Sequence, residues 1–119
     1  MEARRRWRDY RTPSGRRPIK EFIAGLSDHD AAAVVAGMKD VQRSGLRVAR
    51  HLRGPIYEVT ADGEAATFRV LFASVGQREN ILLALEAFSK KTQKTPPAKL
   101  RLAEGRLADW TNRGRKQPR

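Results

Sequence analysis

Residues 81–97 read ILLALEAFSKKTQKTPP, and they join a hydrophobic strand to the last helix of the chain. The first five residues are all apolar, and the run continues as a strand to Phe88. A helical pattern resumes at Ala98 and reaches about Trp110. The stretch therefore predicts a strand over residues 81–88, a basic connection and a final helix.

The connection carries three lysines, Lys90, Lys91 and Lys94, with no acidic residue among them. Ammonium groups gathered where a strand ends suit a phosphate ligand, because an anion offsets their mutual repulsion. A solvated basic loop is the alternative, and the spacing of the lysines does not separate the two.

Two amphipathic helices are expected before the strands. The first has apolar residues at helical spacing, at Ile19, Phe22, Ile23 and Leu26. Pro18 suits its first turn, Ser27 and Asp30 form a capping pattern for the second helix, and Gly45 ends it. Two adjacent amphipathic helices predict an antiparallel hairpin that lies on a sheet.

Two further strands are expected over residues 56–60 and 67–74, with a hairpin turn at Asp62-Gly63 between them. Together with residues 81–88 they form an antiparallel meander, which residues 4–11 join as a fourth strand. Residues 46–55 are interpreted as a basic connector. The predicted fold class is α+β, with an N-terminal helical hairpin packed on a small antiparallel sheet of about four strands, plus a C-terminal helix.

The chain of 119 residues has the size of one domain, which we assign to residues 1–112. Residues 113–119 contain only basic residues, Gly, Pro and Gln. Such a tail cannot bury enough surface to become ordered, although it could also serve as an arm that contacts RNA.

The net charge of +12, from 25 basic and 13 acidic residues, indicates a polyanionic partner such as nucleic acid. The chain has no cysteine and no HExxH motif, so we expect neither a metal site nor a cofactor. No apolar run approaches the ~18 residues of a membrane span, and we expect a cytoplasmic protein that has no membrane partner.

Residues 88–96, FSKKTQKTP, resemble the signature of the HigB-type, phage-related branch of the RelE/ParE toxin superfamily. Residues 56–59 and 68–72 are similar to two strands of that branch, and Ala103 and Arg106 match its final helix. The resemblance covers roughly residues 5–112 and implies a RelE-like fold. It also implies a type II toxin that cleaves mRNA, often on the ribosome. Such a toxin forms a hetero-oligomer with a cognate helix-turn-helix antitoxin.

Cleavage of RNA by its own 2′-hydroxyl needs proton transfer and stabilisation of the phosphate charge, but no metal. Alternation places Arg69 on the strand face opposite Phe68, Val70 and Phe72. If that face is open, its guanidinium can hold the scissile phosphate. The family counts the matching arginine among its active-site residues. A structural ion pair with Glu58 on the next strand is the alternative.

The resemblance extends the candidate catalytic set to Lys90, Lys91 and Lys94, which would share phosphate binding and proton transfer. Glu58 is the candidate base. Glu86 is a departure, because related sequences commonly have a histidine there.

The candidate RNA-binding residues are Arg53, Tyr57, His51 and Lys99. A metal-independent endoribonuclease is the leading hypothesis. A ParE-like inhibitor of DNA gyrase shares the fold, and a non-catalytic basic nucleic-acid-binding module fits the composition.

Overall fold

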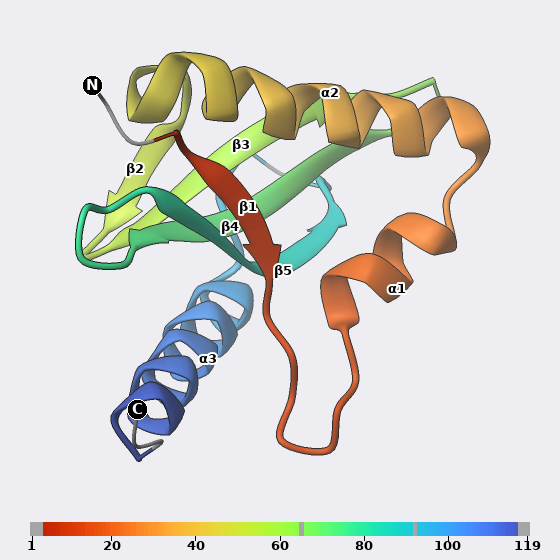
Figure 1. Ribbon diagram of the computed structural model, residues 1–119. Coiled ribbons are helices and arrows are strands. Elements are labelled where there is room, and N and C mark those ends of the chain that lie inside the picture. The colour runs from red at the N-terminus through yellow and green to blue at the C-terminus, as the bar shows by residue number, and fades with distance from the viewer. Residues whose placement is uncertain (1–3, 65, 92, 117–119) are drawn as a thin grey trace.

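The computed structural model describes residues 4–64, 66–91 and 93–116 (Figure 1). Along these residues the elements are β1 (Arg6–Asp9), α1 (Pro18–Ala24), α2 (Asp28–Ser44), the 3₁₀ helix η1 (Gly45–Val48), β2 (Arg50–Arg53), β3 (Ile56–Asp62), β4 (Thr67–Val75), β5 (Ile81–Ser89) and α3 (Pro97–Lys116).

The sheet is mixed and has five strands in the order β1-β5-β4-β3-β2. The meander β3-β4-β5 is antiparallel as predicted, but β1 lies parallel to β5. The expected antiparallel sheet of four strands is therefore wrong in its number of strands and in the direction of β1. Side-chain alternation is the same in parallel and antiparallel pairs, so it could not give the direction of β1. The strand β2, RHLR, was interpreted as a connector because it is short and polar.

The two N-terminal helices do not form the predicted hairpin. The helix α1 packs mainly on β5, and α2 packs mainly on β3. Each helix uses its apolar stripe on the sheet, through Ile19 on α1 and through Val34 and Val41 on α2. Little apolar surface then remains to hold the helices against each other, so they lie side by side only at their junction (Figure 1).

The turn between β3 and β4 is tied to the start of α2. The predicted cap is present, since Ser27 accepts a hydrogen bond from the backbone of Asp30. The buried Asp30 carboxylate in turn accepts from the backbone N–H of Glu64, at 2.7 Å. A Cβ at Gly63 would lie 2.4 Å from Asp30 Oδ1 and 2.7 Å from the Phe68 ring, so this position needs glycine.

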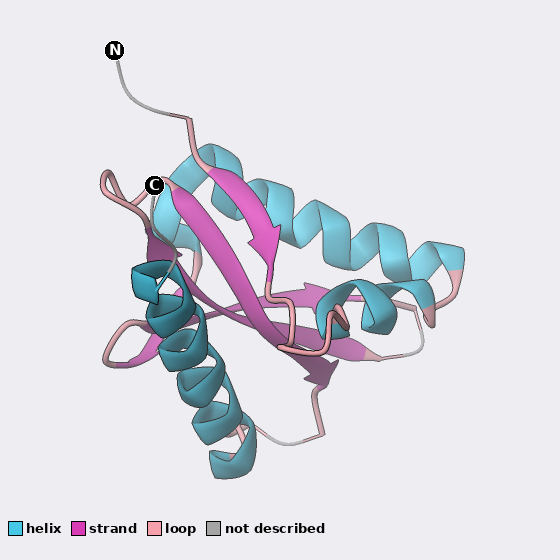
Figure 2. Ribbon diagram, turned by 60° about the horizontal axis from the view of Figure 1, so that its bottom comes forward, coloured by secondary structure: helices cyan, strands magenta, loops and turns pink. Residues whose placement is uncertain are grey.

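The sheet has an apolar core on both faces, and it lies between α2 and α3 (Figure 2). Phe68, Val70 and Phe72 face α1 and α2, whereas Leu71, Ala73 and Leu83 face α3. Ala103 of α3 is fully buried in this second core. The face of the sheet that was expected to be open is therefore covered.

The last helix is longer than predicted and continues to Lys116, so residues 113–116 of the expected disordered tail are helical. Residues 117–119 lie outside the described residues. Asp109 accepts a hydrogen bond from the Tyr10 hydroxyl and pairs with Arg113, which joins α3 to the segment after β1. None of the described helices is long and apolar enough to span a membrane.

Candidate nucleic-acid interface

A bulge in β5 sets the geometry at the start of α3. Leu71 of β4 pairs with Glu86, and the next residue pairs with Ala84, which leaves Leu85 without a partner in the ladder. The nearly buried Glu86 carboxylate accepts from Lys99 Nζ at 2.8 Å and from Arg106 Nη1 at 3.2 Å. Arg106 also donates to the Leu85 carbonyl at 2.8 Å. Glu86 is thus an anchor for α3 and does not take a histidine-like role at the surface.

The expectation that Arg69 lies on an open face is wrong, because its side chain is 2% exposed and forms an ion pair with the equally buried Glu58. The atoms Arg69 Nη1 and Glu58 Oε2 are 3.4 Å apart. The structural ion pair left open by the sequence is therefore present. Glu58, the candidate base, is also out of reach of a surface ligand in this arrangement.

The buried pair of Arg69 and Glu58 holds the connection between β5 and α3 through hydrogen bonds. Thr95 donates its hydroxyl to Glu58 Oε2 at 2.7 Å and accepts from Arg69 Nη1 at 3.1 Å. Arg69 Nη2 donates to the Gln93 carbonyl at 2.7 Å. A charged donor or acceptor in each of these bonds makes them stronger than neutral ones. Arg69 and Glu58 thus fix the course of residues 93–95.

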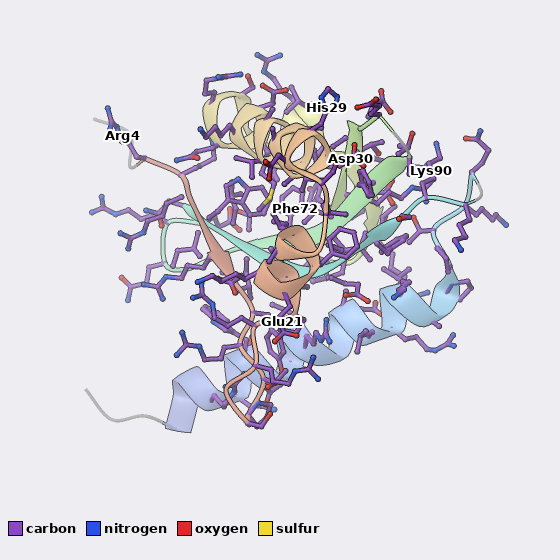
Figure 3. All side chains as sticks on the ribbon, turned by 90° about the vertical axis from the view of Figure 1, so that its right-hand side faces the viewer. Arg4, Glu21, His29, Asp30, Phe72 and Lys90 are labelled. Carbon is purple, nitrogen blue, oxygen red and sulfur yellow. The ribbon has the colours of Figure 1, made fainter. Side chains whose placement is uncertain are left out.

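The lysines lie on the outer side of this connection. Lys91 and Lys94 are exposed and Lys90 is half-buried. Figure 3 shows Lys90 at the opposite side of the molecule from Arg4. Lys90 and Lys91 directly follow β5, which ends at Ser89. That these two lysines and Lys94 together hold a phosphate stays a prediction.

A groove of about 470 Å³ runs beside the lysines. It is lined by Phe22 of α1, by Ala87, Phe88 and Ser89 of β5, by Lys91 and Pro96, and by Lys99 of α3. Phe22 is half-buried and Phe88 is buried, and Lys91 and Lys99 supply the two ammonium groups of the lining. Lys99 Nζ lies 5.5 Å from the centre of the Phe88 ring, which is a cation–π distance.

The other candidate RNA-binding residues lie elsewhere. Arg53 is held by Glu104 of α3 through two hydrogen bonds of 2.9 and 2.7 Å. His51 Nε2 is 2.8 Å from the Gly54 carbonyl, and its ring lies 5.0 Å from that of Tyr57. Tyr57 packs against the core under α2. Of the four predicted residues, Lys99 alone is among the residues that line the groove.

Sequence reasoning missed Phe22 as a residue of the groove. Phe22 lies on the stripe that was predicted as core, and nothing near it in the sequence points to a ligand. Phe22 belongs to the core under α1 and Phe88 to the core under α3, and only the packing of α1 against β5 makes both line one groove. A signal was available for Phe88, which directly precedes the lysine segment.

The described residues contain no group of three or more His, Cys, Asp or Glu side chains that could hold a metal ion.

The fold and the groove define a small α+β protein with a mixed five-stranded sheet and a groove lined by apolar residues and two lysines. A family model, described as phage-derived protein Gp49-like (DUF891), matches residues 21–108, and the chain belongs to this family. The family is associated with toxins of toxin–antitoxin systems of the RelE-like kind. No curated protein matches the chain.

Proposed function

We propose that this protein is the toxin of a type II toxin–antitoxin system and acts as an endoribonuclease on mRNA at the ribosome, without a metal. The groove between α1, β5 and α3 is the observation that carries the proposal. The family association supports the toxin role, and the groove supports RNA as the ligand.

The groove offers the two contacts that single-stranded RNA needs. An unstacked base can lie on the half-buried Phe22 ring, a contact worth about 1–3 kcal/mol per base. Its phosphates then meet the ammonium groups of Lys91 and Lys99 at the rim. Lys99 also forms an ion pair with Glu86 at 2.8 Å, which fixes the position of its ammonium group and offsets part of its charge.

The proposed reaction is attack of a ribose 2′-oxygen on the adjacent phosphorus. A bond forms between this oxygen and phosphorus while the bond to the 5′-oxygen breaks. The products are a 2′,3′-cyclic phosphate and a 5′-hydroxyl. Lys90, Lys91 and Lys94 stabilise the phosphate charge and share the proton transfers. Arg69 and Glu58 act as positioning residues, because they hold the backbone that carries these lysines.

The test uses two parallel reactions of the purified protein with a defined mRNA. The first contains EDTA and no ribosomes. The second contains magnesium and ribosomes. Discrete cleavage in either reaction, abolished in a Lys91→Ala variant that remains folded, supports the proposal. No cleavage in both reactions, together with inhibition of gyrase supercoiling, would indicate the ParE-like alternative.

The same proposal includes a cognate antitoxin, which we expect to be a small helix-turn-helix protein encoded beside the toxin. Co-expression of that neighbour should relieve growth arrest and yield a complex that co-purifies. If the neighbour does neither, the toxin–antitoxin assignment fails even where RNA cleavage is found.

A further inference from the structure

The free edge of β1 is placed to receive another strand. In the described chain β1 has one strand neighbour, β5. Arg6 and Tyr10 donate their backbone N–H groups to carbonyls on or beside β5, each at 2.9 Å. In a parallel ladder the intervening residues direct their backbone groups the other way. The N–H and C=O groups of Trp7 and Asp9 therefore point to the edge that has no strand beside it.

Two hollows flank this edge. The first, of about 410 Å³, is an open hollow between β1, α1 and α2, and its apolar lining includes Trp7, Ile23 and Met38. The second, of about 370 Å³, reaches α3 and is lined by Trp110 and several arginines. Residues 7–9 and Arg17 line both hollows, so the edge and the hollows form one surface. We call this surface the β1 edge.

The charge of the β1 edge is strongly positive. Arg6, Arg8, Arg11 and Lys20 are exposed along it. The carboxylate among the lining residues, Asp9, is neutralised by two hydrogen bonds from Arg17, at 2.9 and 2.6 Å. The Arg17 guanidinium also lowers the pKa of Asp9 below its usual value. An occupant of this surface should therefore be acidic.

Charge and shape also select the class of occupant. A second copy of this chain would bring the same arginines opposite one another, which opposes pairing between edges. Nucleic acid matches the charge but uses neither the backbone donors and acceptors of a strand nor an apolar hollow. An extended peptide with alternating acidic and apolar residues uses all three features.

We propose that the β1 edge binds an extended, acidic segment of a partner protein by strand addition. Alternate apolar side chains of the segment enter the hollow beside Trp7, and its carboxylates meet Arg8 and Lys20 at the rim. The inference does not depend on RNA cleavage. Ile19, Lys20 and Ile23 of α1 line this hollow, whereas Phe22 lines the lysine groove. The helix α1 thus separates the two surfaces, and both can be occupied together.

The test uses the full chain and a short synthetic peptide of alternating glutamate and valine, with blocked ends. The peptide should bind, and the amides of Trp7 and Asp9 should become protected from hydrogen exchange. Two N-methylated peptides are compared, one methylated at the odd residues and one at the even residues. Only one of them should lose binding, because only one of the two sets of amides faces β1. A peptide with lysine in place of glutamate should not bind.

Matched variants separate the β1 edge from general charge. Arg8→Gln/Lys20→Gln should weaken binding of the peptide about tenfold. The control Lys39→Gln/Arg50→Gln removes the same two charges from exposed positions outside both hollows and should change affinity less than about twofold. Circular dichroism should show that both variants are folded.

Three outcomes would overturn the proposal. The first is no binding of the acidic peptide at millimolar concentration. The second is unchanged binding of both N-methylated peptides. The third is loss of peptide binding to a competitor, either an RNA oligonucleotide or a second copy of this chain, since the competitor would then be the occupant of the edge.

Discussion

Arg69 and Glu58 form an ion pair in the interior, where only 2% of each side chain is exposed. A buried pair gives up the hydration of both ions, and loss of one partner leaves the other charged and uncompensated. The effect of a substitution at either position is therefore expected to be structural first and catalytic second.

We expect Arg69→Ala to lower the free energy of unfolding by about 3–5 kcal/mol, because Glu58 would be left buried without its partner. Urea unfolding measures this change. The double variant Glu58→Leu/Arg69→Met removes both charges and should be much closer to the parent in stability. Its connection over residues 93–95 should nevertheless be poorly held, so RNA cleavage should stay low. Full cleavage by a folded Arg69→Ala variant would contradict the positioning role.

Lys91 and Lys99 on the rim of the groove are predicted to act on RNA directly. Lys91→Ala should reduce cleavage by about tenfold or more, since one contact to the reacting phosphate is lost. Stability should change little, because the side chain is exposed. Lys39→Ala, on the exposed face of α2, is the control and should behave like the parent. Equal loss in both variants would mean that the lysine groove is not the site.

At the scale of the elements, an ion pair joins Asp9, the last residue of β1, to Arg17, the residue before α1. The pKa of Asp9 is lowered by its hydrogen bonds and ion pair with Arg17. Its contribution to stability is therefore present above the usual pKa of an aspartate and is lost as the pH falls through the lowered value in the folded protein.

We expect the difference in unfolding free energy between the parent and Asp9→Asn to be positive at neutral pH and to disappear towards pH 2. Denaturant unfolding over this pH range measures the difference, and subtraction of the two curves removes the other titrating groups. A difference that stays constant with pH would show that Asp9 does not stabilise the fold through its charge.

At the scale of the whole molecule, the high positive charge should make RNA binding strongly dependent on salt. Contacts from Lys90, Lys91, Lys94 and Lys99 to four phosphates give a slope of about −3 for log affinity against log salt, at about −0.7 per contact for single strands. Titration of a fluorescent RNA at several salt concentrations measures the slope. A slope near zero would contradict phosphate contacts at the groove.

Much of the fold could be predicted from local patterns. The stripes of α1 and α2, the cap at Ser27, the turn at Gly63 and the strands β3 to β5 all follow from spacing and turn chemistry. The direction of β1 and the strand β2 could not, because they depend on contacts distant in the chain. The candidate site could be predicted only in part, for the same reason. The lysines are adjacent in sequence, whereas Phe22 joins them only through packing.

The burial of Arg69 shows where alternation stops being informative. The alternation of β4 correctly placed Arg69 on the face away from Phe68 and Phe72. It could not show that α3 and residues 93–95 cover that face, since this depends on the bulge at Leu85 and on the contacts of Glu86. The ion pair with Glu58 was the correct choice of the two alternatives.

The most direct test of the proposed function is analysis of the RNA ends formed by the purified protein in EDTA. Mass spectrometry of the products should find a 2′,3′-cyclic phosphate or the 3′-phosphate derived from it, with a 5′-hydroxyl on the other fragment. A single 2′-deoxy substitution at the cut site should block cleavage there, because the attacking oxygen is absent. Products that end in a 3′-hydroxyl, or undiminished cleavage of the 2′-deoxy RNA, would contradict the account.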